Sequence, residues 1–244
     1  MRPWPWGRFA ALPPPLPRAA SSPLLCCVTS LRALAEWGPQ CRRQVEPGGS
    51  AASPAELLTL LRGIVAAGVD WIQIREKDLP ARELFDLTTE CVALAAGRTR
   101  ILVNDRLDVA LAAGAAGVHL GRESAPAREV KQWCRAGHAP PGFLVGVSCH
   151  SLDEALHAEA DGVDYIFFGP VFATPSKEAF GPPQGIARLA EVCRSVRIPA
   201  LAIGGIAPEN AAECFRAGAA GIAAIRLFQQ TTDLPAVVER LRKF

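Results

Sequence analysis

Four segments of the chain repeat one junction, in which an apolar helical pattern ends at a glycine and a run of apolar, often β-branched residues follows. They lie at residues 67–72, 113–119, 161–166 and 217–222. Glycine readily adopts the left-handed backbone conformation that closes a helix C-terminus. The repetition of this junction, at intervals of roughly 50 residues, predicts that helices and strands alternate along the chain.

Helix-start signals support this alternation. Ser53-Pro54-Ala55-Glu56 and Ser151-Leu152-Asp153-Glu154 are capping boxes, in which a serine and a glutamate three residues later satisfy N–H groups at the start of a helix. The first helix also has proline at its first position and an apolar face that includes Leu57, Leu61 and Ile64. Further helices are predicted at residues 79–96, 106–113, 126–135, 185–195, 208–217 and 233–243.

Short apolar runs between the helices predict strands, and such runs are typical of parallel strands buried on both faces. They lie at residues 24–29, 69–75, 101–103, 117–120, 144–147, 164–168, 200–203 and 222–225. Eight strands that are each followed by a helix predict an α/β fold, the (β/α)8 TIM barrel, in a single domain. A doubly wound open sheet is the alternative, but Ser30-Leu31-Arg32 after the first strand lacks the glycine-rich phosphate turn usual in such sheets.

The composition suits a barrel and excludes several function classes. A chain of 244 residues that is 50% hydrophobic can bury a large core. A net charge of +2 is too small to indicate binding to nucleic acid or a membrane surface, and no apolar run reaches the length of a membrane span. The 8 cysteines include no Cys-x-x-Cys pair, so we interpret them as reduced packing thiols of a cytoplasmic protein. The oligomeric state is left open, with a homo-oligomer as one alternative.

Two segments differ from the predicted barrel. Residues 1–22 are rich in proline, tryptophan and arginine and lack the apolar core of a signal peptide. We interpret them as a disordered extension, or as the product of a start codon placed too far upstream, so that the barrel comprises residues 23–244. Residues 38–50 are predicted to form a long loop.

The segment Gln73-Ile74-Arg75-Glu76-Lys77 ends the second predicted strand. Because side chains alternate along a strand, Gln73, Arg75 and Lys77 are expected on one face. Positive charges at the end of a buried strand are costly unless an anion neutralises them, so the segment indicates a pocket for a phosphorylated ligand. An edge strand with a solvated basic face is the alternative.

Polar residues also follow the other predicted strands, at the end of the barrel where (β/α)8 enzymes place their active sites. In chain order they are Asn104 and Asp105, His119 to Ser124, Ser148 to Ser151, Thr174 to Lys177, Gly204 and Gly205, and Ile225 and Arg226. Because these strand ends meet at one rim, the polar groups are predicted to converge on a shared site. The Gly204-Gly205 pair is the most specific signal, because glycines ahead of a helix leave N–H groups free to hold a phosphate.

Several of these residues also have an ordinary interpretation. Asn104 and Asp105 are suited to cap the next helix, and His119 to form hydrogen bonds inside the barrel. His150 precedes a capping serine and is compatible with an exposed loop, and Lys177 is compatible with a solvated position. Taken singly these alternatives stay open, whereas the convergence of the whole set favours a ligand site.

Taken together, these residues resemble the thiamine phosphate synthase / TenI superfamily. The matching segments are Gln-Ile-Arg-Glu-Lys (73–77), Val-Asn-Asp (103–105), Gly-Val-His-Leu-Gly (117–121), Gly-Val-Ser-Cys-His-Ser (146–151), Phe-Gly-Pro-Val-Phe-Ala-Thr-Pro-Ser-Lys (168–177) and Ala-Ile-Gly-Gly-Ile (202–206). The resemblance covers the chain from about residue 24 to residue 240. The ordered set is far more specific than any single motif.

The resemblance implies a (β/α)8 transferase of thiamine biosynthesis, which joins 4-amino-2-methyl-5-hydroxymethylpyrimidine pyrophosphate to thiazole phosphate and releases pyrophosphate. It implies that the pyrimidine pyrophosphate is bound by Gln73, Arg75, Lys77, Asn104, Ser148 and Lys177. It implies that Asp105 ligates Mg²⁺, and that the thiazole phosphate is surrounded by Thr174, Ser176, Gly204, Gly205, Ile225 and Arg226. Because charge accumulates on the departing oxygens, the residues expected to be catalytic are Arg75, Lys77, Ser148 and Lys177.

Three residues bear on the choice within this superfamily. Ser124 stands where the synthases usually have a second Mg²⁺-binding aspartate, so it is expected to be a weak ligand. Arg226 replaces the usual small serine, and it either binds the thiazole phosphate or fills its site. His150 stands where TenI-type thiazole tautomerases have their catalytic acid/base. The sequence favours the synthase; the alternatives are a tautomerase that uses His150 and a non-catalytic barrel that binds thiazole or thiamine phosphate.

Overall fold

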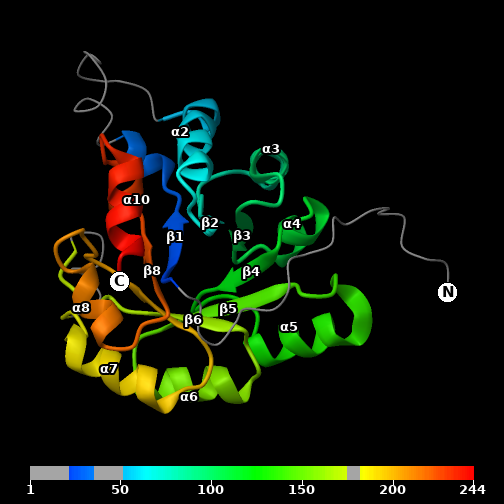
Figure 1. The fold of residues 1–244 in the computed structure, drawn as a ribbon. Helices are drawn as coiled ribbons and strands as arrows, with labels where there is room; N and C mark the ends of the chain where they lie inside the picture. Colours follow the sequence, from blue (N-terminus) through cyan, green and yellow to red (C-terminus); the bar gives the residue numbers. More distant parts are fainter. Residues whose placement is uncertain (1–21, 36–51, 175–181) are drawn as a thin grey trace.

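The computed structural model describes residues 22–35, 52–174 and 182–244, and its eight parallel strands close into a barrel in the order of the sequence (Figure 1). The strands are β1 (Leu24–Val28), β2 (Trp71–Ile74), β3 (Arg100–Asn104), β4 (Gly117–Leu120), β5 (Leu144–Cys149), β6 (Tyr165–Phe168), β7 (Ala200–Ile203) and β8 (Gly221–Ala224). The closing pair is β1 with β8. The predicted (β/α)8 fold is therefore confirmed, and the open doubly wound sheet is excluded.

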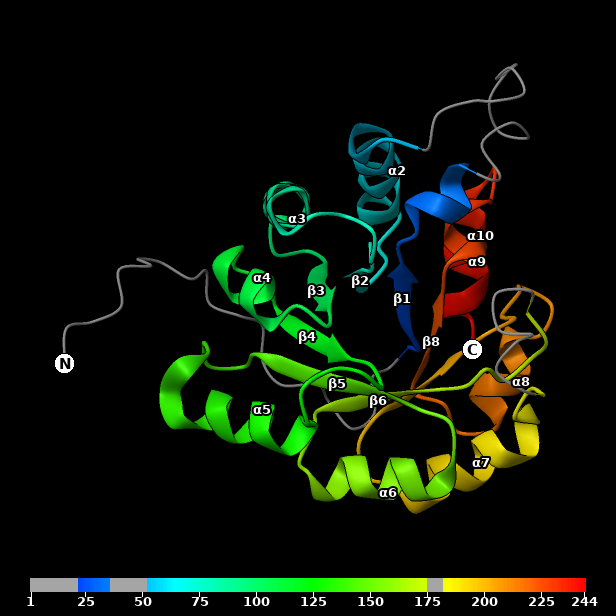
Figure 2. The same ribbon diagram turned by 180° about the vertical axis from the view of Figure 1, so that it is seen from behind.

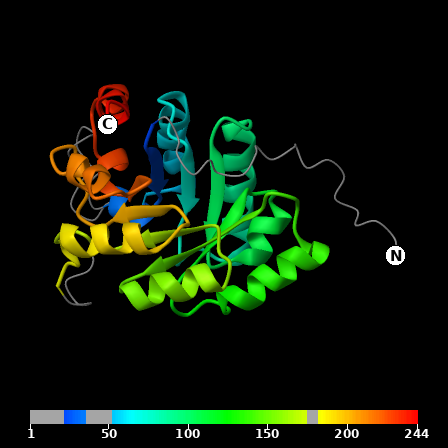
Figure 3. The same cartoon turned by 60° about the horizontal axis from the view of Figure 1, so that its bottom comes forward.

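Helices cover the outside of the barrel, as the front, back and tilted views show (Figure 1, Figure 2 and Figure 3). They are α2 (Pro54–Ala66), α3 (Ala81–Ala95), α4 (Leu107–Ala112), α5 (Ala127–Trp133), α6 (Leu152–Ala160), α7 (Gly185–Ser195), α8 (Ala211–Arg216), α9 (Arg226–Gln229) and α10 (Leu234–Arg242). Both predicted capping serines are in place, because Ser53 Oγ accepts from the Glu56 N–H and Ser151 Oγ from the Glu154 N–H. A helical stretch at residues 31–35 follows β1.

The glycines of the repeated junction close helices as predicted. Gly68, Gly114, Gly162 and Gly218 have φ values of +83°, +70°, +77° and +95°, so each adopts the left-handed conformation. A strand begins within three residues of each glycine. The four glycine junctions, from which the alternation of helices and strands was inferred, are therefore confirmed.

Some element boundaries differ from the prediction. The strand predicted to reach residue 75 ends at Ile74, and the helix predicted from residue 208 begins at Ala211 because a turn precedes it. Helix α5 continues into a π-helical turn at Cys134–His138, and α9 begins directly after β8 without a side-chain cap. Neither feature has a start signal in the sequence, so neither was predicted. The predictions for residues 1–21 and for the loop at residues 38–50 lie outside the described residues.

The interior of the barrel is apolar and close-packed. Trp71 and Tyr165 are fully buried there, with their ring centroids 4.8 Å apart in an edge-on arrangement. Gly146 pairs with Tyr165 in the register of β5 and β6, and a side-chain carbon at Gly146 would come within 2.1 Å of the tyrosine ring. A small residue beside a large one lets the layers of side chains fit together.

The cysteines of the described part of the chain are free thiols, and most of them are buried. Burial raises the pKa of Cys91 and of Cys149 to about 12, so both stay protonated and inert near neutral pH. The interpretation of the cysteines as packing thiols is confirmed for these positions, and Cys41 lies outside the described residues. Within the same ranges, the helices are too short and too polar for a membrane span.

Two aspartates anchor the amino-terminal end of the barrel in the same way. Asp70 directly precedes β2, and its carboxylate accepts a hydrogen bond from the Leu25 N–H of β1 at 2.7 Å and one from Arg242 of α10 at 2.8 Å. Asp164 directly precedes β6, and it accepts from the Val145 N–H of β5 at 2.7 Å.

Lys131 of α5 completes the second clamp, because its Nζ lies 2.8 and 2.9 Å from the two Asp164 oxygens. The Asp70 clamp joins β1, β2 and α10, and the Asp164 clamp joins β5, β6 and α5. The two clamps are therefore four strands apart around the barrel. Lys131 is buried, so its charge depends on Asp164 for compensation.

We predict that Lys131→Met lowers the free energy of unfolding by about 2–3 kcal/mol, because it leaves a partly buried carboxylate without its cation. Urea denaturation at neutral pH measures this loss. The matched control is Lys243→Met, which removes an exposed ion pair with Glu239 and should change the free energy by less than about 0.5 kcal/mol. Equal losses in the two variants would show that the Asp164 clamp is no stronger than a surface pair.

Candidate active site

An inward-facing layer of polar side chains lies on top of the apolar interior, at the carboxyl ends of neighbouring strands. Gln73, Asn104, His119 and Ser148 share the strand faces of interior residues such as Trp71 and Leu102. Gln73 Nε2 donates to Asn104 Oδ1 at 3.3 Å, and Asn104 Nδ2 donates to Asp105 Oδ2 at 2.5 Å. The predicted convergence of these residues is thus present as a connected hydrogen-bond chain.

Asp105 is the end point of that chain and adopts an unusual backbone conformation. Its φ of +60° is left-handed, which is uncommon for any residue other than glycine but is tolerated best by aspartate and asparagine. Its Oδ1 accepts from the Gly121 N–H at 3.0 Å and from the Ser124 hydroxyl. The two predicted metal-binding residues, Asp105 and Ser124, are therefore in direct contact.

Arg75 follows β2 at the same rim. Its N–H donates to Thr29 Oγ1 at 3.0 Å, which fixes the backbone, and its side chain is half-buried. Within the described ranges, no residue accepts a hydrogen bond from the Arg75 guanidinium. Both Arg75 and Asp105 lie near enough to His119 to shift its pKa.

The structure excludes the edge-strand alternative for this segment and contradicts the expected position of Lys77. β2 pairs with β1 and with β3, so it is not an edge strand and its basic residues are not a solvated edge. Lys77 does not continue the strand alternation, because β2 ends at Ile74 and Lys77 lies exposed in the following turn. Glu76 is buried instead, where its Oε2 accepts from the Leu31 N–H at 2.8 Å and burial raises its pKa.

His119 is buried beneath the rim, as its ordinary interpretation predicted. Its Nε2 lies 2.9 Å from Ser148 Oγ, and its Nδ1 lies 3.1 Å from the Tyr165 hydroxyl. Burial lowers the pKa of His119 from 6.5 to about 3; Asp105 opposes this shift, and Arg75 adds to it. The imidazole is therefore neutral at physiological pH.

The two glycines after β7 have the backbone expected of an anion cradle. Gly204 and Gly205 have φ values of +94° and +66°. Added side-chain carbons would come within 2.5 Å of Pro170 and 2.6 Å of the Ala173 carbonyl oxygen, so both positions require glycine. Neither N–H donates to another residue among those that the structure describes, and Asn210 holds the loop by donating to the Gly205 carbonyl at 2.9 Å.

The remaining predicted residues are distributed around the same rim. His150 follows β5, its N–H donates to Glu154 at 2.5 Å, and its Nδ1 contacts the Gly169 carbonyl oxygen. A carbonyl oxygen only accepts, so Nδ1 carries the proton in this contact. Thr174, Ile225 and Arg226 are half-buried, and Arg226 begins α9. Ser176 and Lys177 lie outside the described residues.

The residues present fit a magnesium ion bound through one carboxylate. Mg²⁺ prefers oxygen ligands and commonly uses one or two carboxylates together with waters and substrate phosphates. Asp105 supplies the carboxylate and Ser124 a neutral hydroxyl beside it. Within the described ranges there is no cluster of three or more His, Cys, Asp or Glu side chains, so Asp105 would share the ion with neutral oxygen ligands.

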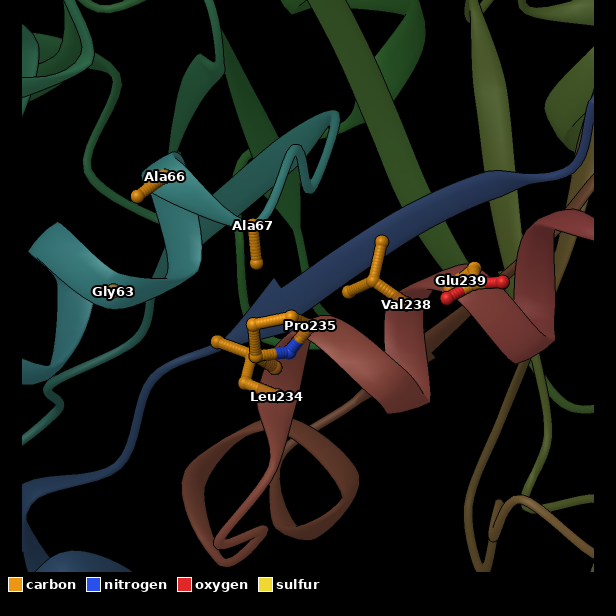
Figure 4. Close-up of a pocket in the computed structure, with 7 residues that line it drawn as sticks. All are labelled: Gly63, Ala66, Ala67, Leu234, Pro235, Val238 and Glu239. Carbon is orange, nitrogen blue, oxygen red and sulfur yellow. The ribbon is translucent and has the colours of Figure 1, made fainter.

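A separate groove of about 470 Å³ lies on the flank of the barrel between α2 and α10 (Figure 4). Figure 4 shows that its lining is formed by Gly63, Ala66, Ala67, Leu234, Pro235, Val238 and Glu239. Among the described residues this lining is largely apolar, and its one charged side chain, Glu239, is acidic, so the groove does not suit a phosphorylated ligand. The carboxyl-end rim is therefore the candidate active site.

Sequence reasoning missed two participants in the rim. The Gly121 N–H donates to Asp105, and a side-chain carbon at Gly121 would lie 3.2 Å from Asp105 Oδ1, a tight contact that Asp105 would have to relieve by a small shift. Tyr165 holds His119 from below. The alternation of β4 and β6 places both His119 and Tyr165 inside the barrel, but their contact depends on closure of the sheet.

Comparisons with known proteins agree on one family. A family model described as thiamine monophosphate synthase matches residues 48–228. The thiamine-phosphate synthase of Methanoculleus marisnigri is 43% identical over 190 residues, 75% of this chain and 85% of that protein. That of Moorella thermoacetica is 44% identical over 188 residues, 76% of this chain and 87% of that protein. The solved structure of thiamine phosphate pyrophosphorylase from Pyrococcus furiosus has a TM-score of 0.69 at 31% identity and covers 91% of this chain and 95% of that chain.

The low pKa of His119 predicts a contribution to stability that depends on pH. Because the folded pKa of about 3 lies below the ordinary value of 6.5, the contribution is complete above pH 6.5 and is lost as the pH falls toward 3. The loss is on the order of 4 kcal/mol. Urea denaturation between pH 4 and pH 7 should give a shallower pH dependence for His119→Gln than for the unaltered protein. His157→Gln, at an exposed position, should leave the slope unchanged; equal slopes in all three proteins would contradict the assignment.

Proposed function

Because the chain belongs to the thiamine monophosphate synthase family, we propose that its rim condenses 4-amino-2-methyl-5-hydroxymethylpyrimidine pyrophosphate with thiazole phosphate. The products are thiamine phosphate and pyrophosphate. The observation that carries the proposal for this rim is the Arg75 guanidinium, which is half-buried and without a hydrogen-bond acceptor among the described residues. A cation in such a position is stabilised by an anionic ligand.

The reaction breaks the bond between the pyrimidine CH₂ carbon and the pyrophosphate oxygen, and the thiazole nitrogen forms the new bond to that carbon. Negative charge accumulates on the departing oxygens, so donors fixed beside them lower the barrier. Arg75 supplies a planar charged fork, and Ser148 supplies a hydroxyl. The nitrogen is itself the nucleophile, so the chemistry does not require a general base.

We assign the remaining residues by their place on the rim. Gln73 and Asn104 form the polar floor beside Asp105 and are suited to contact the pyrimidine. The N–H groups of Gly204 and Gly205, which have no hydrogen-bond acceptor among the described residues, are suited to the thiazole phosphate, next to Thr174, Ile225 and Arg226. The roles of Lys77, Ser176 and Lys177 in binding the phosphates stay predictions. We also propose a cytoplasmic enzyme, which the free thiols support.

We propose Mg²⁺ as the cofactor, held by Asp105 with Ser124 as a weak additional ligand. When bound, Mg²⁺ would neutralise charge on the pyrophosphate as a Lewis acid. Asn104 and Gly121 orient the Asp105 carboxylate from two sides, which presents it toward the rim. The alternative functions, a tautomerase that uses His150 and a non-catalytic barrel, stay predictions, and membership of the synthase family supports the synthase.

Incubation of the pure protein with both substrates and Mg²⁺ should yield thiamine phosphate. Arg75→Gln should lower kcat/KM by about 10²- to 10³-fold, because it removes the charge that stabilises the leaving group. Arg82→Gln is the matched control, since Arg82 is exposed on α3 and forms an ion pair with Asp86 of the same helix. Product formation can be followed by chromatography. If no product forms under conditions in which a known synthase is active, the proposed function is wrong.

The metal proposal predicts that Ser124→Asp lowers the Mg²⁺ concentration needed for half-maximal activity several-fold, because a second carboxylate strengthens the site. Without metal, the same variant should unfold at a lower temperature, because two carboxylates then face each other. A Mg²⁺ titration and a thermal melt measure these effects. Ser195→Asp adds the same charge at an exposed position and should change neither. An unaltered Mg²⁺ titration of Ser124→Asp would place the ion elsewhere.

A further inference from the structure

Two buried polar side chains beneath the rim have no role in the function proposed above. Tyr165 and His119 are both buried, and they form a chain that leads from the barrel interior to Ser148. The Tyr165 hydroxyl lies 3.1 Å from His119 Nδ1, and His119 Nε2 lies 2.9 Å from Ser148 Oγ. Because each contact joins two groups that can both donate and accept, the direction of the chain has to be determined from the neighbouring groups.

The rings in this chain are held rigidly. Tyr165 packs edge-on against Trp71, and Gly146 provides the space that its ring occupies. The His119 ring lies against Phe167, with the ring centroids 4.2 Å apart. Both rings are buried and packed against aromatic neighbours, which favours a single orientation for the two hydrogen bonds.

The tyrosine determines the direction of the chain. Burial raises the pKa of its phenol well above the ordinary value, so the hydroxyl keeps its proton. Within the described part of the chain, His119 Nδ1 is the sole hydrogen-bond partner of that hydroxyl. The reverse direction would leave the phenol proton without an acceptor in an apolar interior, which is costly. The phenol therefore donates to Nδ1.

The one N–H proton of the neutral His119 imidazole must then be on Nε2. Nδ1 accepts from the tyrosine, so Nε2 carries the proton and donates it to Ser148 Oγ. Ser148 is half-buried, and its hydroxyl makes no other hydrogen bond within the described residues. The Ser148 proton is therefore directed away from His119 and is available to an acceptor at the rim.

We propose that Tyr165 and His119 are positioning residues that fix the Ser148 hydroxyl as a hydrogen-bond donor to a phosphate oxygen of the substrate. The ligand class is a pyrophosphate or pyrophosphate ester, which offers acceptors and no donors when fully ionised. The proposal rests on the proposed function for the identity of this ligand. If the Ser148 hydroxyl could rotate freely, it would point its lone pairs at the phosphate oxygens in a fraction of the protein molecules. In those molecules the hydroxyl would repel the ligand.

The tautomer of His119 is tested by NMR on uniformly ¹⁵N-labelled protein. Long-range ¹H–¹⁵N correlation distinguishes protonated from unprotonated imidazole nitrogens, and His119→Gln identifies the His119 signals by their loss. The expected result is a protonated Nε2 and an unprotonated Nδ1. Protonation of Nδ1 instead would reverse the chain and overturn the proposal, whether or not the protein makes thiamine phosphate.

The consequence for binding is tested by a double-mutant cycle with inorganic pyrophosphate and Mg²⁺, measured by calorimetry. Ser148→Ala should weaken binding by about tenfold, as expected for one hydrogen bond to a charged group. Tyr165→Phe should weaken binding several-fold in the unaltered background and have no further effect in the Ser148→Ala background. An equal loss in both backgrounds would mean that Tyr165 acts only through stability, which would overturn the proposal.

Leu201→Val is the packing control, since it trims a buried side chain of the same interior without touching the chain of hydrogen bonds. It should lower the melting temperature and leave pyrophosphate binding unchanged. If the unaltered protein binds pyrophosphate but makes no thiamine phosphate, the proposed function is wrong. The double-mutant cycle of Ser148 and Tyr165 would still test whether Tyr165 positions Ser148. If the unaltered protein does not bind pyrophosphate with Mg²⁺, the proposed role of Ser148 is wrong.

Discussion

The Asp105 carboxylate joins the ends of neighbouring strands into one rigid rim. It accepts from Asn104 at the end of β3 and from Gly121 and Ser124 after β4, and Asn104 in turn accepts from Gln73 of β2. Its left-handed backbone turns the chain at the point where β3 ends, which is a strained conformation of the kind that concentrates at functional sites. This network ties together the ends of β2 and β3 and the segment after β4.

The rest of the barrel supports this rim from below. The interior below the layer of Gln73, Asn104, His119 and Ser148 is largely apolar, and the Tyr165 hydroxyl is the group there that bonds to the layer, through His119. At the opposite end of the barrel, the Asp70 and Asp164 clamps hold the amino-terminal ends of the strands. Stability and chemistry therefore lie at opposite ends of the same strands, as the (β/α)8 architecture permits.

Much of this arrangement could be predicted from the sequence, because it depends on local patterns. The glycine junctions and short apolar runs identified all eight strands, and strand order alone places Asn104, Asp105 and Ser148 at one rim. Contacts across the closed barrel could not be predicted, and the bond between His119 and Tyr165, 46 residues apart, is the clearest case. Lys77 was misplaced because strand alternation was extended beyond Ile74, where β2 gives way to a turn.

The proposed function requires that these rim residues bind one magnesium–pyrophosphate group. The most direct test is a crystal structure of the protein grown with Mg²⁺ and inorganic pyrophosphate. We expect a metal ion within coordination distance of Asp105 and phosphate oxygens within hydrogen-bond distance of the Arg75 guanidinium and Ser148 Oγ. A pyrophosphate bound in the groove between α2 and α10, or a rim that contains only water at saturating ligand, would contradict it.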